Sequence, residues 1–136
     1  MKTLVLFYSY SGNSKRLANE LAAKESADIA EIKDVKRPGT LKAYSVGCFA
    51  AMRGKAWPIQ PLSADLSDYE RLILFAPIWA GNPAPAFNAV LELLPAGKPV
   101  EVKLVSGSGE SNCEERLKGI ITNKGCSLDG FENIKA

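Results

Sequence analysis

Six consecutive residues near the start of the chain combine hydroxyl side chains with a glycine: Ser9, Tyr10, Ser11, Gly12, Asn13 and Ser14. An apolar run precedes this stretch and a helical pattern follows it at once. A turn of this kind at a helix N-terminus offers an anion backbone N–H groups, a favourable helix dipole and short hydroxyl donors. We therefore predict a phosphate-binding loop at residues 9–14. The ordinary alternative is a serine-capped turn without a ligand. The pattern GxxxxGK[ST] of nucleoside triphosphate sites is not matched.

Two later stretches have an unusual composition for loops. The first follows an apolar run and consists of Pro77, Ile78, Trp79, Ala80, Gly81 and Asn82. The second also follows an apolar run and consists of Ser106, Gly107, Ser108 and Gly109. The first offers an indole ring and a pliable backbone, whereas the second lets a flat ligand approach its main chain closely. Taken alone, Trp79 is equally explained as a core or surface aromatic, and residues 106–109 as a flexible turn.

Strand and helix patterns alternate along the whole chain. Strands are expected at residues 4–8, 27–32, 72–76, 99–105 and 131–134. Helices are expected at residues 13–23, at 41–52 with an interruption near Gly47, after Pro85, and from a Ser111 or Asn112 cap to Gly125. Strands without polar alternation are typical of a parallel sheet covered on both faces. The sequence predicts one doubly wound, three-layer α/β/α domain over residues 1–136, in which the three loops converge at one edge of the sheet.

Composition excludes several classes of function. A net charge of +2 argues against nucleic acid as the main partner. The chain has no histidine, which removes Ser-His-Asp and Cys-His catalysis and the usual transition-metal sites. Three widely separated cysteines fit a reduced protein, and no apolar run approaches the length of a membrane span. We expect a cytoplasmic protein that binds neither nucleic acid nor membrane.

A family resemblance rests on the three loops together. Residues 8–14, Tyr-Ser-Tyr-Ser-Gly-Asn-Ser, resemble the flavodoxin phosphate loop S/T-x-T/S-G-x-T/S. Residues 76–87 resemble the ring-contacting loop of short flavodoxin-like proteins, and residues 105–109 resemble their third loop. The resemblance covers nearly the whole chain. It implies a five-stranded parallel sheet of order 2-1-3-4-5 with FMN bound at the strand ends.

The resemblance also implies a role for each loop. Ser9, Ser11 and Ser14, with the amides of residues 10–14, would bind the FMN phosphate. Trp79 would lie against the isoalloxazine ring, and the backbone of residues 80–82 would face its N5 and O4 edge. Either the Ala80–Gly81 or the Gly81–Asn82 peptide would flip to accept a hydrogen bond from a protonated N5. Residues 106–109 would donate amide hydrogen bonds to O2 and N1, and no side chain would act as a general acid or base.

This sequence departs from the family pattern in three ways. Ordinary flavodoxins are strongly acidic, whereas residues 33–55 carry six basic side chains and one acidic side chain. That basic segment is expected to be a solvated face. The less favoured alternatives are docking of an acidic partner and binding of the ribityl-phosphate side of the ligand. The third loop has no aromatic residue. The final helix of the family is expected to be absent, which would leave part of the sheet open to a partner subunit in a homodimer.

Three functions are consistent with these features. The first is an FMN-binding electron-transfer protein that serves redox partner proteins or reduces a small quinone-like substrate. The second is an FMN-dependent NAD(P)H:quinone-type reductase, which the nearly balanced charge favours slightly. The third is a non-enzymatic binding module on a flavodoxin-like fold with a degenerate flavin site.

Overall fold

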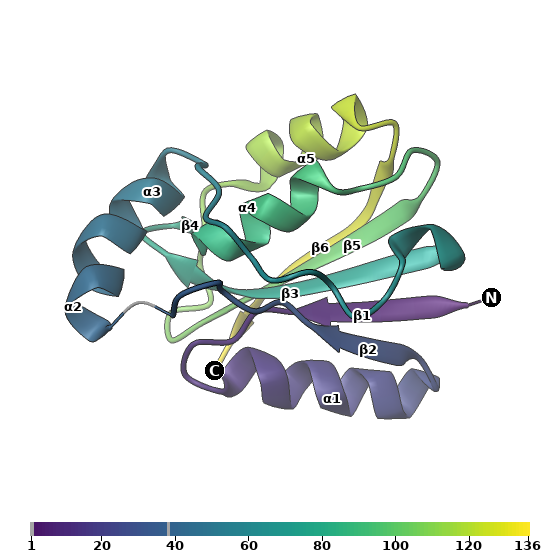
Figure 1. Cartoon of the computed structure of the whole chain (residues 1–136), viewed down its shortest axis with the longest axis horizontal. Helices are drawn as coiled ribbons and strands as arrows, with labels where there is room; N and C mark the ends of the chain where they lie inside the picture. Colours follow the sequence, from purple (N-terminus) through teal and green to yellow (C-terminus); the bar gives the residue numbers. More distant parts are fainter. Residues whose placement is uncertain (1, 38) are drawn as a thin grey trace.

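The computed structural model describes residues 2–37 and 39–136 of the chain. Its helices and strands alternate along the sequence, as the hydrophobic pattern predicts (Figure 1). In chain order the elements are β1 (Thr3–Phe7), α1 (Asn13–Glu25), β2 (Asp28–Glu31), α2 (Thr40–Lys42), the π-helix η1 (Ala43–Gly47), α3 (Cys48–Met52), the 3-10 helix η2 (Leu66–Asp68), β3 (Arg71–Trp79), β4 (Asn82–Pro83), α4 (Pro85–Glu92), β5 (Pro99–Ser106), α5 (Glu114–Asn123) and β6 (Ser127–Lys135).

Five strands form one parallel sheet in the order β2-β1-β3-β5-β6. This confirms the predicted order 2-1-3-4-5, because the two-residue β4 lies off this path and pairs antiparallel with β3. The apolar runs of β1 and β3 are buried along most of their length. Both strands lie inside the sheet with helices on either side, which explains why their sequences lack polar alternation.

The sheet separates two apolar cores. Figure 1 shows α1 on one side of the sheet and α4 and α5 on the other. On one face, Ala18 and Ala22 of α1 pack against Val5 and Phe75. The larger core on the other face includes Phe87 from α4 and side chains of α5. The arrangement is the three-layer α/β/α architecture expected from the sequence. In the described part of the chain, no helix is long and apolar enough to cross a bilayer.

Several element boundaries differ from the prediction. β3 continues to Trp79, so Pro77, Ile78 and Trp79 belong to a strand and not to a loop. β6 has nine residues, more than the short strand expected. The residue before α5 is Cys113, and no side chain caps this helix. The expected cap from Ser111 is wrong because its hydroxyl donates instead to Asn133 Oδ1, 2.7 Å away.

The helix expected at residues 41–52 is helical from Thr40 to Met52, but its middle is a π-helix that ends at Gly47. The extra residue per turn in a π-helix rotates the two halves relative to each other. The π-helix is therefore the interruption that the sequence predicts near Gly47. α2, η1 and α3 together form a helical cover, residues 40–52, over the end of β3 (Figure 1).

No helix follows β6 in the described residues, which end one residue after it. On the α1 side of the sheet, β5 and β6 carry charged side chains. Lys103 Nζ lies 2.8 Å from Glu132 Oε1, and Arg71 pairs with both Glu25 and Glu101. The part of the sheet beyond α1 is therefore lined by ion pairs, where a covering helix would require apolar contacts.

Truncation of Phe87 tests the larger core. Its side chain is fully buried, so Phe87→Ala should lower the free energy of unfolding by about 3–5 kcal/mol. Leu93→Ala is the matched control at the end of the same helix, because Leu93 is 54% exposed, and it should cost well under 1 kcal/mol. Urea denaturation followed by circular dichroism measures both. Equal losses in the two variants would contradict the assignment of this core.

Candidate functional site

The loop at residues 9–14 joins β1 to α1 and leaves the start of the helix open. Gly12 precedes the helix with φ +105°, a left-handed conformation that favours glycine. No side chain caps α1. Its first N–H groups therefore lack the internal partner that a serine cap would supply, and they remain available to an anion. This observation argues against the serine-capped turn considered above.

The serines of this loop do not all face the same way. Ser9 Oγ accepts a hydrogen bond from Gly12 N at 3.0 Å and so shapes the turn. Ser14 is buried, with 3% of its surface exposed. Ser14 lines a cavity of about 220 Å³ together with Tyr10, Ser11 and Asn13. Ser9 and Gly12 are not among the residues that line it.

The second predicted loop is a tight β-hairpin. Trp79 pairs with Asn82, and the two residues between them, Ala80 and Gly81, have φ +51° and +82°. Positive φ at both central positions defines a type I′ turn. A left-handed conformation costs an alanine about 1–2 kcal/mol. The sequence Ala-Gly is not the Asn-Gly or Asp-Gly pair typical of such turns, which is why no hairpin was predicted here.

Hydrogen bonds from other elements hold the hairpin. Gly81 O accepts from Asn112 N at 3.1 Å, and Asn82 Oδ1 accepts from Arg116 Nη2 at 2.9 Å. Asn82 Nδ2 in turn donates to Ala80 O at 3.2 Å. The Gly81–Asn82 peptide is therefore tied to the backbone before α5. The Ala80–Gly81 peptide is held at its carbonyl by a side chain of the same hairpin.

Trp79 is the centre of an aromatic cluster. Its ring lies edge-on to those of Tyr8, Tyr10 and Trp57, with centroid distances of 6.3, 5.6 and 6.3 Å. Gly47 of the helical cover packs directly on the indole, where a Cβ atom would lie 2.8 Å from Trp79 Cζ3. The indole is thus fixed by packing on several sides, and Gly47 is required for the close approach of the cover.

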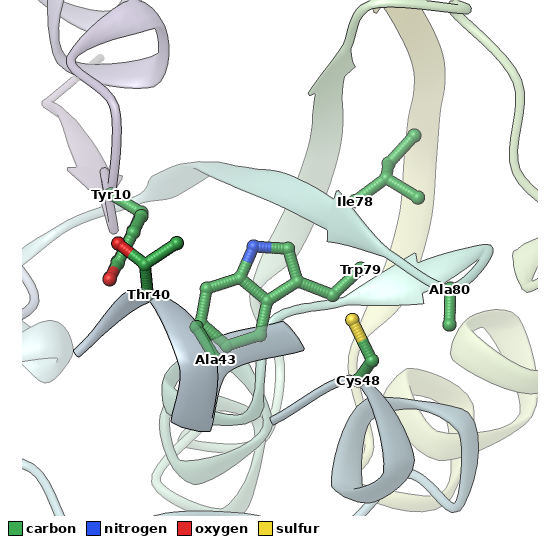
Figure 2. A pocket seen from close by; sticks show the side chains of 7 residues that line it. All are labelled: Tyr10, Thr40, Ala43, Cys48, Ile78, Trp79 and Ala80. Atoms are coloured by element: carbon green, nitrogen blue, oxygen red, sulfur yellow. The ribbon is translucent and has the colours of Figure 1, made fainter. Parts of the chain in front are cut away.

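Two cavities share the Trp79 side chain. The cavity of about 220 Å³ brings the three predicted loops together, because Pro77, Ile78, Trp79, Ser106 and Gly107 also line it, with Ala136. A second, mostly apolar cavity of about 290 Å³ is lined by Tyr10, Ile78, Trp79 and Ala80 and by Thr40, Ala43 and Cys48 of the helical cover. Figure 2 shows the indole between the hairpin and the cover in this second cavity.

Only the first half of the third loop, Ser106 and Gly107, lines the cavity of about 220 Å³. Ser106 Oγ accepts from Gly109 N at 2.9 Å, and Ser108 Oγ accepts from Glu110 N at 3.2 Å. The Gly109 amide is therefore already engaged within the loop. Gly109 has φ +70° and a Cβ there would lie 3.0 Å from Lys135 Cβ, which explains the glycine. Ser108, Gly109, Gly81 and Asn82 support the two loops but do not line either cavity described above.

Four residues that shape the site were not among the predicted site residues: Asp34, Arg37, Gly47 and Arg116. Arg37 Nη2 donates to Tyr10 O at 2.5 Å, and its guanidinium lies 4.2 Å from the centroid of the Tyr10 ring. Arg37 belongs to the basic segment that the sequence marks as unusual. Arg116 carried no signal in the sequence, because it lies on α5 and reaches Asn82 from 34 residues away.

A hydrogen-bonded tyrosine–carboxylate pair, Tyr8 and Asp34, lies next to Trp79. Tyr8 Oη donates to Asp34 Oδ2 at 2.5 Å, while the buried Asp34 Oδ1 has no partner among the described residues. Burial raises the pKa of Tyr8 well above its ordinary value, and the hydrogen bond to Asp34 adds to this. Burial also raises the pKa of Asp34, although the Tyr8 hydroxyl and the charge of Arg37 oppose it.

Solved structures with a similar fold were found by comparison. A flavoprotein in complex with FMN from Lactobacillus acidophilus has a TM-score of 0.74 and 20% identity, over 96% of this chain and 91% of that one. Oxidised flavodoxin 1 from Bacillus cereus has a TM-score of 0.58 and 19% identity, over 100% and 86%. Flavodoxin from Streptococcus pneumoniae has a TM-score of 0.59 and 13% identity, over 100% and 87%.

No family model and no curated protein sequence matches the chain. At these levels of identity the solved structures define the fold. The chain has the flavodoxin-like fold, as its sequence motifs and strand order predict.

Gly47→Ala tests the contact between the cover and Trp79. The new Cβ would overlap the indole, so we expect lower stability and a changed near-ultraviolet circular dichroism of the tryptophans. Gly119→Ala in α5 is the matched control, because nothing lies within 4 Å of its Cβ position, and helix propensity should stabilise it by about 0.5–1 kcal/mol. A Gly47→Ala variant as stable as Gly119→Ala would refute the packing described here.

Asp34→Asn tests the buried carboxylate. Because the folded-state pKa of Asp34 is raised, its contribution to stability is fully present below the pKa of the unfolded chain. That contribution is lost as pH rises through the folded-state pKa. The amide should therefore gain stability relative to the parent on going from about pH 3 to pH 7. Urea denaturation of both proteins across this range measures the difference.

Proposed function

We propose that this protein binds FMN where its three loops meet and functions in electron transfer. When bound, FMN supplies one- and two-electron redox chemistry. The observation that carries the proposal is the uncapped start of α1, which opens beside a cavity lined by hydroxyl groups on one side and by Trp79 on the other. The flavoprotein from Lactobacillus acidophilus, with the same fold, is in complex with FMN.

The residues divide into two groups under this proposal. The N–H groups at the start of α1, with Ser11, Asn13 and Ser14, hold the phosphate. Trp79 and Tyr10 present aromatic surface to the ring, and Ile78 excludes water beside them. Ala80 of the hairpin and Ser106 and Gly107 of the third loop face the ring, and Gly81, Asn82, Ser108 and Gly109 hold these two loops in place. The three free cysteines support a reduced, cytoplasmic setting.

Ligand titration separates the two groups of residues. The parent should bind FMN and riboflavin with a shift of the visible flavin absorption. Trp79→Ala should weaken both ligands, because the loss of stacking is worth about 0.5–1.5 kcal/mol beyond buried area. The double variant Ser11→Ala and Ser14→Ala should weaken FMN by about tenfold or more while riboflavin affinity stays unchanged. The absence of any flavin binding by the parent protein would reject the proposal in favour of a non-enzymatic binding module.

A second candidate function is an FMN-dependent NAD(P)H:quinone-type reductase. The observation that favours it is the mostly apolar cavity of about 290 Å³ beside Trp79, which offers a flat substrate a place next to the cofactor loops. NAD(P)H would donate a hydride to the loaded protein, and a quinone would leave as hydroquinone after taking up two electrons and two protons. Steady-state oxidation of NAD(P)H in the presence of a quinone distinguishes this activity from that of a carrier.

A further inference from the structure

Exposed apolar side chains are concentrated on one surface segment. Among the described residues, seven large apolar side chains are exposed, and five of them lie between residues 35 and 52. Leu41 is 84% exposed, Phe49 55% and Met52 60%; Val35 and Val46 are the other two. Exposed apolar side chains that gather in one part of a protein surface typically mark an interaction site. We call the described part of this segment, residues 35–37 and 39–53, the docking surface.

The docking surface lies within the most basic part of the chain, residues 33–55. Residues 33–55 carry a net charge of +5, which leaves −3 for the rest of a chain whose total is +2. The basic groups lie among aromatic rings. Arg53 is 4.4 Å from the Phe49 ring centroid, Lys42 is 5.8 Å from that of Trp57, and Arg37 stacks on Tyr10. Exposed apolar side chains together with arginines and aromatic rings have the composition of a protein interface.

The same segment contacts the candidate site. Gly47 packs on Trp79, and Thr40, Ala43 and Cys48 line the cavity that the indole borders (Figure 2). The inner face of the cover thus forms a wall of the site, while its outer face carries the exposed apolar side chains. A helix is about 10–12 Å in diameter. A protein seated on the outer face would therefore lie about one helix diameter from the cofactor position.

We propose that the docking surface binds an acidic electron-transfer protein. This inference rests on the proposed function and specifies its partner. The positive charge selects a negatively charged surface and steers its approach, and the apolar side chains supply the contact area after encounter. The step itself forms and breaks no bond. One electron leaves the reduced, FMN-loaded protein and reduces the redox group of the acceptor.

Nuclear magnetic resonance locates the contact without any redox activity. The probe is zinc-substituted rubredoxin, a small acidic redox protein, titrated into the 15N-labelled chain with and without FMN. We expect amide shifts confined to residues 35–53 and to the hairpin at Trp79. Binding should weaken as ionic strength rises from about 20 to about 300 mM, where the screening length falls below 10 Å. Shifts elsewhere, or none at low salt, would overturn the proposal.

Stopped-flow reduction of native rubredoxin measures the consequence for electron transfer. Reversal of charge at Lys36, Lys42 and Arg53 to Glu should slow the second-order reduction of its ferric iron by about tenfold or more at low salt. The matched control reverses Lys24, Lys118 and Lys124, which lie on α1 and on or next to α5, away from the docking surface. It changes the net charge equally and should have a much smaller effect. Equal slowing in the two variants would show that the net charge of the protein controls the rate. It would then reject a specific role for the docking surface.

Two further experiments test whether the docking surface binds a membrane or a second copy of the chain instead. Cosedimentation with vesicles of phosphatidylserine and phosphatidylcholine, abolished by Phe49→Ser and Met52→Ser, would overturn the proposal in favour of a membrane surface. A dimer in sedimentation velocity that the same variants dissociate would overturn it in favour of a second copy of the chain. Failure of the proposed function is separate, because it appears as absent FMN binding, whereas failure of this inference appears in a protein that binds FMN normally.

Discussion

The parallel pairing of β1, β3 and β5 is the constraint on which the site depends. In register, Phe7 lies beside Phe75 and Pro77 beside Val105, so the ends of the three strands occupy one edge of the sheet. Residues far apart in sequence then line one cavity. The hydrophobic cores on both faces hold this register, because a slip of one residue would move the side chains of each strand into the opposite core, where they would not fit the packing. The packing of the two cores therefore determines which residues meet at the cavity.

Much of this arrangement could be predicted from local patterns. The uninterrupted apolar runs at Leu4 and Leu72 specify buried parallel strands, and Gly12 after a hydroxyl-rich turn specifies a helix start. The hairpin at Ala80 could not be predicted, because its geometry is imposed by Asn112 and Arg116 from a distant part of the chain. The position of Gly47 against Trp79 is likewise a tertiary contact, and the sequence shows it as a weak point in a helix. The strands and the start of α1 can thus be predicted from neighbouring residues, whereas the hairpin and the Gly47–Trp79 contact depend on residues far away in the sequence.

The helical cover, residues 40–52, contacts the candidate site on one face and is exposed on the other. Its inner face contributes to the environment of Trp79, and its outer face has the charge and apolar exposure of an interface. Movement of the cover would therefore change the site and the surface together, since both belong to one short helical segment. The π-helical turn at residues 43–47 lies where these functions meet, and such turns recur at functional positions in other proteins.

The last strand, β6, forms one edge of the sheet, where its unpaired N–H and C=O groups could recruit another chain. A register shift opposite Val100 and Glu101 interrupts its pairing, and it carries Asp129, Glu132 and Lys135 along its length. Irregular pairing and alternating charge are devices that natural proteins use against edge-to-edge aggregation. The polar end of this small sheet therefore protects the chain against fibril-like association with other copies of itself.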